Sequence, residues 1–77
     1  MDIYDTWKVY KERIEKGFSV FNEGARTSDF DKMKEGKDAA KNYYLKFIEL
    51  IKMQSRSDQE AFKETLDDFV KEIKKMG

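Results

Sequence analysis

The sequence predicts an all-α protein, a three-helix up-down-up antiparallel bundle that residues 1–77 form as a single domain. Apolar residues recur along the chain at alternating steps of three and four, which places them on one face of a helix. No segment alternates apolar and polar residues with the period of two that is typical of a β-strand. Two short turns divide the pattern into three helices, and short connections between long helices make neighbours antiparallel.

The first helix is expected over residues 3–23. Asp2 or Asp5 can cap its free backbone N–H groups. Gly24 is expected to end it, because glycine tolerates the left-handed conformation that often follows the last helical residue. Its apolar face is formed by Ile3, Trp7, Tyr10, Ile14, Gly17 and Phe21.

The second helix is expected over residues 28–54, with Ser28 as its N-cap and Asp29 and Asp31 at the positive end of its dipole. Gly36 lies inside the pattern and costs up to about 1 kcal/mol relative to alanine. A helix kinked or split at Gly36 is therefore the alternative to a continuous one. The apolar positions are Phe30, Met33, Ala40, Tyr44, Phe47 and Ile51.

The third helix is expected over residues 58–76. Ser57 and Glu60 match the capping box S-x-x-E, in which each side chain caps a backbone N–H group near the other. Lysines near the end of the chain suit the negative end of the helix dipole. The apolar face is formed by Phe62, Leu66, Phe69, Ile73 and Met76.

An antiparallel bundle of these helices has a core with two ends. One end collects Tyr4, Trp7, Tyr10, Tyr43, Tyr44, Phe47, Phe62 and Leu66. The opposite end collects Phe18, Phe21, Phe30, Met33, Ile73 and Met76. Trp7 with Tyr4 and Tyr10 could form a ligand-binding box, but an aromatic row at helical spacing is more often part of a core, and we interpret it so.

Composition excludes several classes of function. The 16 basic and 16 acidic residues cancel, whereas nucleic-acid-binding domains usually carry a basic excess. The first residues lack a basic segment followed by an apolar run, and no apolar stretch approaches the roughly 20 residues that span a bilayer. We therefore expect a cytoplasmic protein without a signal peptide or a transmembrane segment.

The sequence offers no catalytic or metal site. It contains no histidine and no cysteine, so the commonest general base, a thiol nucleophile and the usual zinc ligands are missing. Glu60, Glu64 and Asp67 share one helix face, but this acidic row points away from the apolar face, and we interpret it as solvated. We expect a protein that is not an enzyme and that uses no metal and no cofactor.

The unusual surface lies on the second helix. Between residues 43 and 53 only three positions are polar, so apolar side chains cover more than half of the circumference. Leu45 and Ile48 fall outside the arc that faces the bundle, in line with a row of lysines. The candidate partner-binding residues are Leu45, Ile48, Lys41, Lys52, Lys37 and Lys34.

Three interpretations of this surface stay open. The neighbouring helices can cover Leu45 and Ile48, or these residues can form a partner interface with lysines at its rim. The lysine row Lys34, Lys37 and Lys41 can also bind an anionic surface, although Asp38 lies within it. We hypothesise a non-catalytic interaction module that self-associates as a homodimer or docks a helical protein partner. The alternative is a small regulatory protein that binds nucleic acid or another anionic surface.

Overall fold

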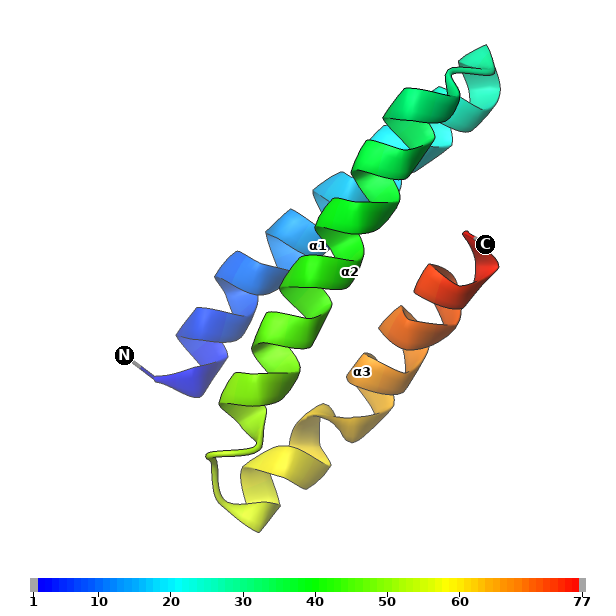
Figure 1. Cartoon of the computed structure of the whole chain (residues 1–77). Coiled ribbons are helices and arrows are strands. Elements are labelled where there is room, and N and C mark those ends of the chain that lie inside the picture. Colours follow the sequence, from blue (N-terminus) through cyan, green and yellow to red (C-terminus); the bar gives the residue numbers. More distant parts are fainter. Residues whose placement is uncertain (1, 77) are drawn as a thin grey trace.

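The computed structural model describes residues 2–76 of the chain. These residues form three helices, α1 (Ile3–Thr27), α2 (Phe30–Ile51) and α3 (Arg56–Lys75), and contain no strand. The helices run up, down and up, so each one is antiparallel to the next (Figure 1). The all-α three-helix bundle that the sequence predicts is confirmed.

α1 and α2 form a long hairpin whose backbones meet at two buried glycines. A Cβ atom on Gly17 would lie 2.7 Å from the carbonyl oxygen of Gly36, and a Cβ atom on Gly36 would lie 2.5 Å from the carbonyl oxygen of Gly17. Only residues without a Cβ atom fit such an approach. Gly36 therefore serves the contact between the helices, and α2 continues through it without a split.

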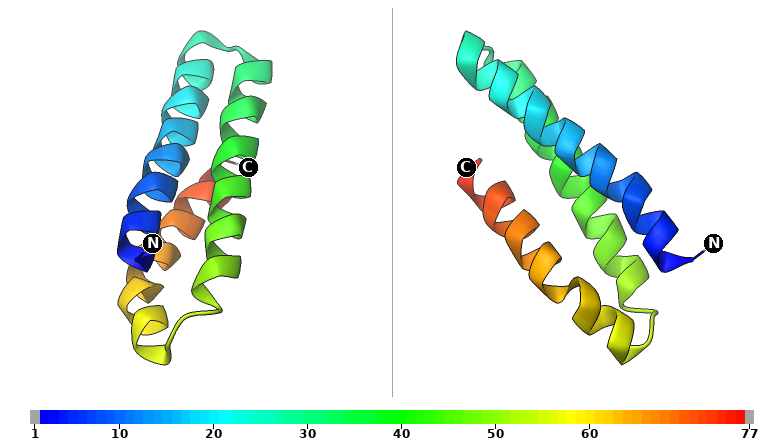
Figure 2. Two further views of the ribbon diagram at one scale, coloured as in Figure 1. Left: turned by 90° about the vertical axis from the view of Figure 1, so that its left-hand side faces the viewer. Right: turned by 180° about the vertical axis from the view of Figure 1, so that it is seen from behind.

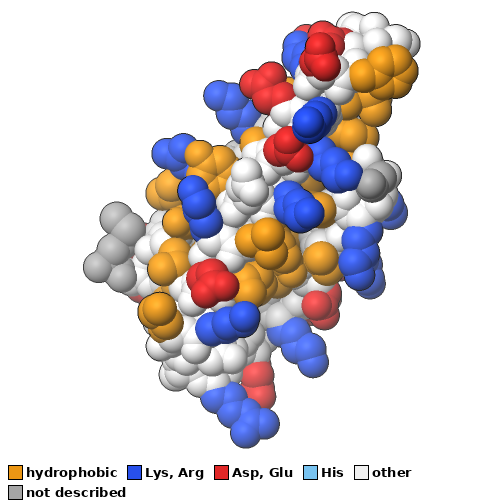
Figure 3. All heavy atoms as spheres, viewed as in Figure 1, with side chains coloured by type: hydrophobic (Ala, Val, Ile, Leu, Met, Phe, Trp, Pro, Cys, Tyr) orange, Lys and Arg blue, Asp and Glu red, His pale blue; other side chains and the backbone are white. Residues whose placement is uncertain are grey.

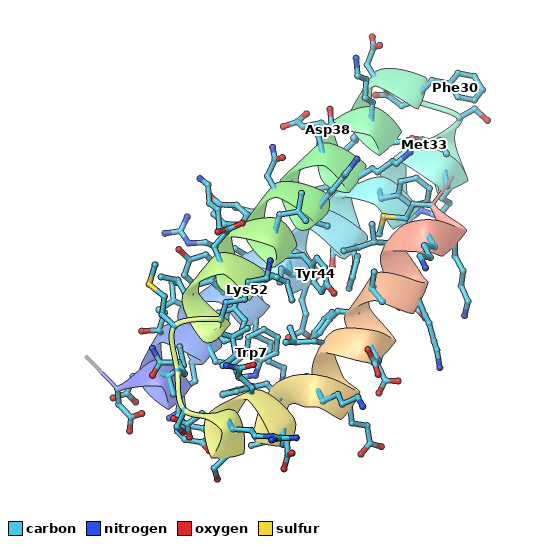
Figure 4. All side chains as sticks on the ribbon, turned by 60° about the horizontal axis from the view of Figure 1, so that its bottom comes forward. Trp7, Phe30, Met33, Asp38, Tyr44 and Lys52 are labelled. Atoms are coloured by element: carbon cyan, nitrogen blue, oxygen red, sulfur yellow. The ribbon has the colours of Figure 1, made fainter. Side chains whose placement is uncertain are left out.

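α3 packs against this hairpin through aromatic side chains, and its backbone diverges from the hairpin towards the C-terminus (Figure 1 and the right view of Figure 2). The ring of Trp7 lies between the helices (Figure 4), 4.8 Å from the ring of Phe47 and 5.4 Å from that of Phe69, measured between centroids. Phe62 contacts both Trp7 and Phe47. Trp7 is thus a core residue that spaces α3 from the hairpin.

The buried residues form two adjoining clusters. The first is the aromatic end that the sequence predicts, and its buried members are Phe47, Ile51, Phe62 and Leu66. The second contains Ile14, Ala40 and Ile73. Partly buried Trp7 and Tyr44 pack against both clusters, so the core continues from one to the other.

The opposite end of the predicted core forms only in part. Ile73 is buried, and Phe18 stacks on Phe69 with ring centroids 5.7 Å apart. Phe30, however, is 77% exposed. α3 has 20 residues against 25 in α1, so it covers only part of the hairpin and leaves the tip uncovered (Figure 2).

The turn between α1 and α2 differs from the prediction. α1 continues past Gly24, and Ser28 takes the left-handed conformation (φ 56°, ψ 33°). Asp29, rather than Ser28, caps α2 by accepting a hydrogen bond (3.1 Å) from a backbone N–H of the first turn. Gly24 is instead buried against α2, where a Cβ atom would lie 2.7 Å from the backbone nitrogen of Met33.

The turn between α2 and α3 differs in the opposite direction, because it lies earlier in the chain than predicted. α2 ends at Ile51, and Ser55 is the N-cap of α3, because its Oγ accepts a hydrogen bond (3.2 Å) from the backbone N–H of Asp58. The predicted capping box of Ser57 and Glu60 is wrong, since Ser57 lies within the first turn of α3. Ser55, two positions earlier, has the extended backbone of an N-cap (φ −61°, ψ 157°), although Asp58 rather than a glutamate follows it three residues later.

The glycine crossing can be tested by adding one methyl group. Gly36→Ala should destabilise the protein by about 1–3 kcal/mol, because the methyl group overpacks a contact between two backbones. The roughly 1 kcal/mol by which alanine is favoured over glycine inside a helix offsets part of the overpacking cost, so the net loss is expected in the lower part of this range. Urea unfolding followed by circular dichroism measures the change in the free energy of unfolding. Asn42→Ala, at an exposed position of α2, is the control, and equal stability of the two variants would contradict the crossing.

The cap of α3 can be tested with the two neighbouring serines. Ser55→Ala should lower the free energy of unfolding by about 0.5–2 kcal/mol, because it leaves a backbone N–H group without its partner. Ser57→Ala, which removes the same hydroxyl from the first turn, should change it by less than about 0.5 kcal/mol. Thermal and urea unfolding measure both losses. A larger loss for Ser57→Ala than for Ser55→Ala would support the predicted capping box instead.

Candidate functional site

The candidate site is a groove between α2 and α3, formed by two adjoining pockets of about 380 and 310 Å³ that share Tyr44. We call it the α2–α3 groove. The larger pocket, near the α2–α3 turn, is lined by Tyr44, Ile48, Ile51, Lys52, Arg56, Gln59, Glu60, Lys63, Leu66 and Asp67. The smaller one is lined by Lys37, Lys41, Tyr44, Leu45, Val70, Ile73 and Lys74.

The groove follows from the unequal spacing of the helices. Gly17 and Gly36 bring α1 and α2 into backbone contact, whereas the rings of Trp7, Phe62 and Phe69 hold α3 away from the hairpin. α3 therefore does not fully cover the apolar face of α2. On the face seen in Figure 3, apolar side chains lie between α2 and α3, with several basic and a few acidic side chains around them.

Five of the six residues selected from the sequence line the groove. Leu45, which is 48% exposed, lines the smaller pocket together with Lys37 and Lys41. Ile48 and Lys52 line the larger one. The neighbouring helices thus cover these residues only in part. The prediction that Leu45 and Ile48 lie together outside the core is wrong for Ile48, which packs against the first core cluster.

Lys34 is the residue that the structure separates from the others. It is exposed on α2, but it does not line either pocket, because the groove ends about one turn nearer the α2–α3 turn. The lysine row Lys34, Lys37 and Lys41 is therefore only partly joined to the apolar surface.

Sequence reasoning missed the wall of the groove that α3 supplies. Leu66, Val70 and Ile73 line this wall at steps of four and three. Leu66 and Ile73 belong to the apolar face predicted for the third helix, and Val70 widens that face towards α2. This spacing is visible in the sequence and could have revealed the wall. The distance between α3 and α2, which leaves the wall accessible, is not visible there.

Basic side chains dominate the rim of the groove. They are Lys37, Lys41, Lys52, Arg56, Lys63 and Lys74, against the two acidic residues Glu60 and Asp67. Arg56 and Glu60 form an exposed ion pair one helical turn apart (3.6 Å). The chain as a whole has no net charge, so the positive character of the groove is a local property.

The acidic row on α3 lies on the edge of the molecule. Glu60, Glu64 and Asp67 line a shallow polar depression in which Lys63 and Lys71 also lie. Within residues 2–76, no group of three or more acidic side chains is arranged to hold a metal ion. The same part of the chain has no helix with the length and apolar character needed to cross a membrane.

No protein-family model matches the sequence, and comparisons with curated proteins and with solved structures give no significant match. The groove is the feature of the molecule from which a function can be inferred.

Tyr44 connects the two pockets and lies between α2 and α3 (Figure 4). Burial, and secondly the negative charge of Asp67, raise the pKa of its hydroxyl above the ordinary value of 10.0. Both effects disfavour the phenolate form. Tyr44 is therefore a neutral hydrogen-bonding group at physiological pH, at the centre of an otherwise apolar floor.

The raised pKa predicts a dependence of stability on pH. Because the unfolded chain has the lower tyrosine pKa, it releases this proton first as the pH rises. The stabilisation is fully present below pH 10.0 and is lost as the pH rises through the higher pKa of the folded state. Between about pH 9 and 11, the free energy of unfolding should fall more steeply for the wild-type protein than for Tyr44→Phe. Urea titrations measure both slopes, and parallel slopes would place Tyr44 in open solvent.

Proposed function

We propose that this protein is a non-catalytic interaction module that binds a protein partner through the α2–α3 groove. The observation that carries the proposal is an accessible apolar floor with a charged rim, the arrangement that protein interfaces commonly show. The absence of histidine and cysteine from the sequence supports a role in binding rather than catalysis. A cytoplasmic location is part of the same proposal.

The two walls of the groove suit a helix. Leu45 and Ile48 on α2 are one helical turn apart, and so are Val70 and Ile73 on α3. A partner helix laid between them can place one apolar residue per turn against both walls, which is the usual way in which an amphipathic helix occupies a groove. α3 has 20 residues and is therefore about 30 Å long, enough for several turns of a partner.

The small core supports association as well. Only Phe47 and Ile14 have large side chains that are fully buried among the described residues. A chain of this length has little apolar surface to bury, and a partner that binds only the folded state adds to its stability. The partner is another helical protein or a second copy of this chain.

Binding to an anionic surface is the second candidate function. The basic excess at the groove favours it, because lysines attract phosphate groups. The rim supplies no stacking platform for bases, however. Tyr44 is the one aromatic side chain of the groove, and it is partly buried.

A pair of variants with matched exposure tests the proposal. Leu45 on α2 is 48% exposed and Val9 on α1 is 44% exposed, and only Leu45 lines the groove. Peptides selected from a displayed random library for binding to the wild-type protein should bind Leu45→Glu about 30-fold more weakly, because the variant loses a contact of about 2 kcal/mol. Val9→Glu should bind them as wild type does. Fluorescence anisotropy measures the affinities.

The controls separate binding from folding and from self-association. Both variants should retain the helical circular dichroism signal, because both positions are half exposed. Light scattering over a concentration series shows whether the wild-type chain forms dimers, which Leu45→Glu should then dissociate. Equal behaviour of Leu45→Glu and Val9→Glu in every assay would contradict a binding function of the groove.

A further inference from the structure

We infer that the partner is an acidic amphipathic helix, with its apolar face in the α2–α3 groove and its carboxylates against the basic rim. This inference rests on the proposed function and specifies the chemistry of the occupant. It follows from three features of the molecule: the sign of the rim charge, the surfaces that a second copy can offer, and the concave shape of the apolar floor.

The sign of the charge is clearest at the smaller pocket. Its charged lining residues are Lys37, Lys41 and Lys74, and it contains no acidic side chain. The larger pocket is lined by three basic residues, Lys52, Arg56 and Lys63, and by two acidic ones, Glu60 and Asp67. Its excess of positive charge is therefore small, and Arg56 is paired with Glu60. A ligand with carboxylates along both edges of its apolar face matches this rim, and a ligand with lysines there is repelled.

A second copy of the chain does not supply such a ligand. In a symmetric dimer the same surface meets itself, so a dimer through the groove would bring one basic rim against the other. The other large apolar side chains exposed among residues 2–76 are Tyr4, Val9, Phe30 and Met53, which are scattered over α1, the hairpin tip and the α2–α3 turn. They form no apolar helix face with acidic flanks.

The shape of the floor argues against a flat or purely polar ligand. Ile51, Leu66 and Ile73 are buried residues that line the groove, so the floor lies below the rim. A lipid surface is contacted by apolar side chains that project outwards from a protein. A nucleic-acid backbone has no apolar groups to fill a recessed floor. A helix with leucine-sized side chains has both the convex shape and the apolar groups.

Two designed peptides of about 18 residues, some 27 Å long as helices, test the inference. Both carry leucines at helical steps of three and four, and they differ only in the flanking residues, which are glutamates in one and lysines in the other. The glutamate peptide should bind about tenfold more tightly at low salt, and the difference should narrow in about 0.5 M salt because ions screen the rim. Fluorescence anisotropy measures both.

Charge-reversal variants assign the effect to the rim. The double variant Lys41→Glu with Lys52→Glu should lose about tenfold in affinity for the glutamate peptide and gain affinity for the lysine peptide. The matched control, Lys8→Glu with Lys11→Glu, changes the net charge equally on the exposed surface of α1 and should retain the preference for the glutamate peptide. An equal effect of the two double variants would overturn the assignment to the rim.

The remaining outcomes separate this inference from the proposed function. If the lysine peptide binds as tightly as the glutamate peptide, the inference of an acidic partner is wrong, but the groove remains a binding site. The same holds if neither peptide binds and the chain forms a dimer that Leu45→Glu dissociates. If a scrambled glutamate peptide binds as tightly as the amphipathic one, charge alone is recognised, and the inference of an amphipathic helix is wrong. If vesicles with phosphatidylserine bind and neither peptide does, or if nothing binds, both proposals fail.

Discussion

The backbone contact between α1 and α2 at Gly17 and Gly36 is the constraint on which the rest of the structure depends. Because the two helices touch there, little space remains between them for side chains. The large apolar residues of the hairpin must therefore project to the side of α3. The two core clusters reflect this, since each joins residues of the hairpin to residues of α3.

The position of α3 is the direct consequence. Trp7, Phe47 and Phe62 form a group of mutually contacting rings, and rings of this size keep the helix axes apart. α3 is thus held by side chains, while the hairpin is held by its backbones. The rings of Trp7 and Phe18 fill the wider space between α1 and α3 by packing on Phe69, and the accessible groove lies between α2 and α3.

The distribution of charge gives this opening its chemical character. A neutral chain can still present faces of opposite sign, because screening at physiological salt limits the reach of each charge to about 8 Å. The acidic row of α3 adjoins the groove, because Glu60, Lys63 and Asp67 line both the groove and the acidic depression, whereas Lys37, Lys41 and Lys52 lie on the α2 side of the groove. In the proposed function, the apolar floor supplies affinity and the basic rim selects the sign of the ligand's charge.

The sequence by itself determined the number of helices and the aromatic end of the core, because both depend on the spacing of apolar residues along one helix, and it determined the antiparallel order through the short turns. Five of the six residues that it selected on α2 line the groove. It misjudged Gly24 as the end of the first helix and Ser57 as a cap, and it left a break at Gly36 open as an alternative. Within one helix, a glycine predicts a break or an end of the helix. At Gly24 and Gly36, however, a neighbouring backbone lies where a Cβ atom would be, so the glycines serve the packing of two helices. The tertiary structure alone decided the exposure of Phe30, the exclusion of Lys34 and the wall formed by Val70. These depend on where α3 lies and ends relative to the hairpin, which is set by packing between helices rather than by any pattern within one.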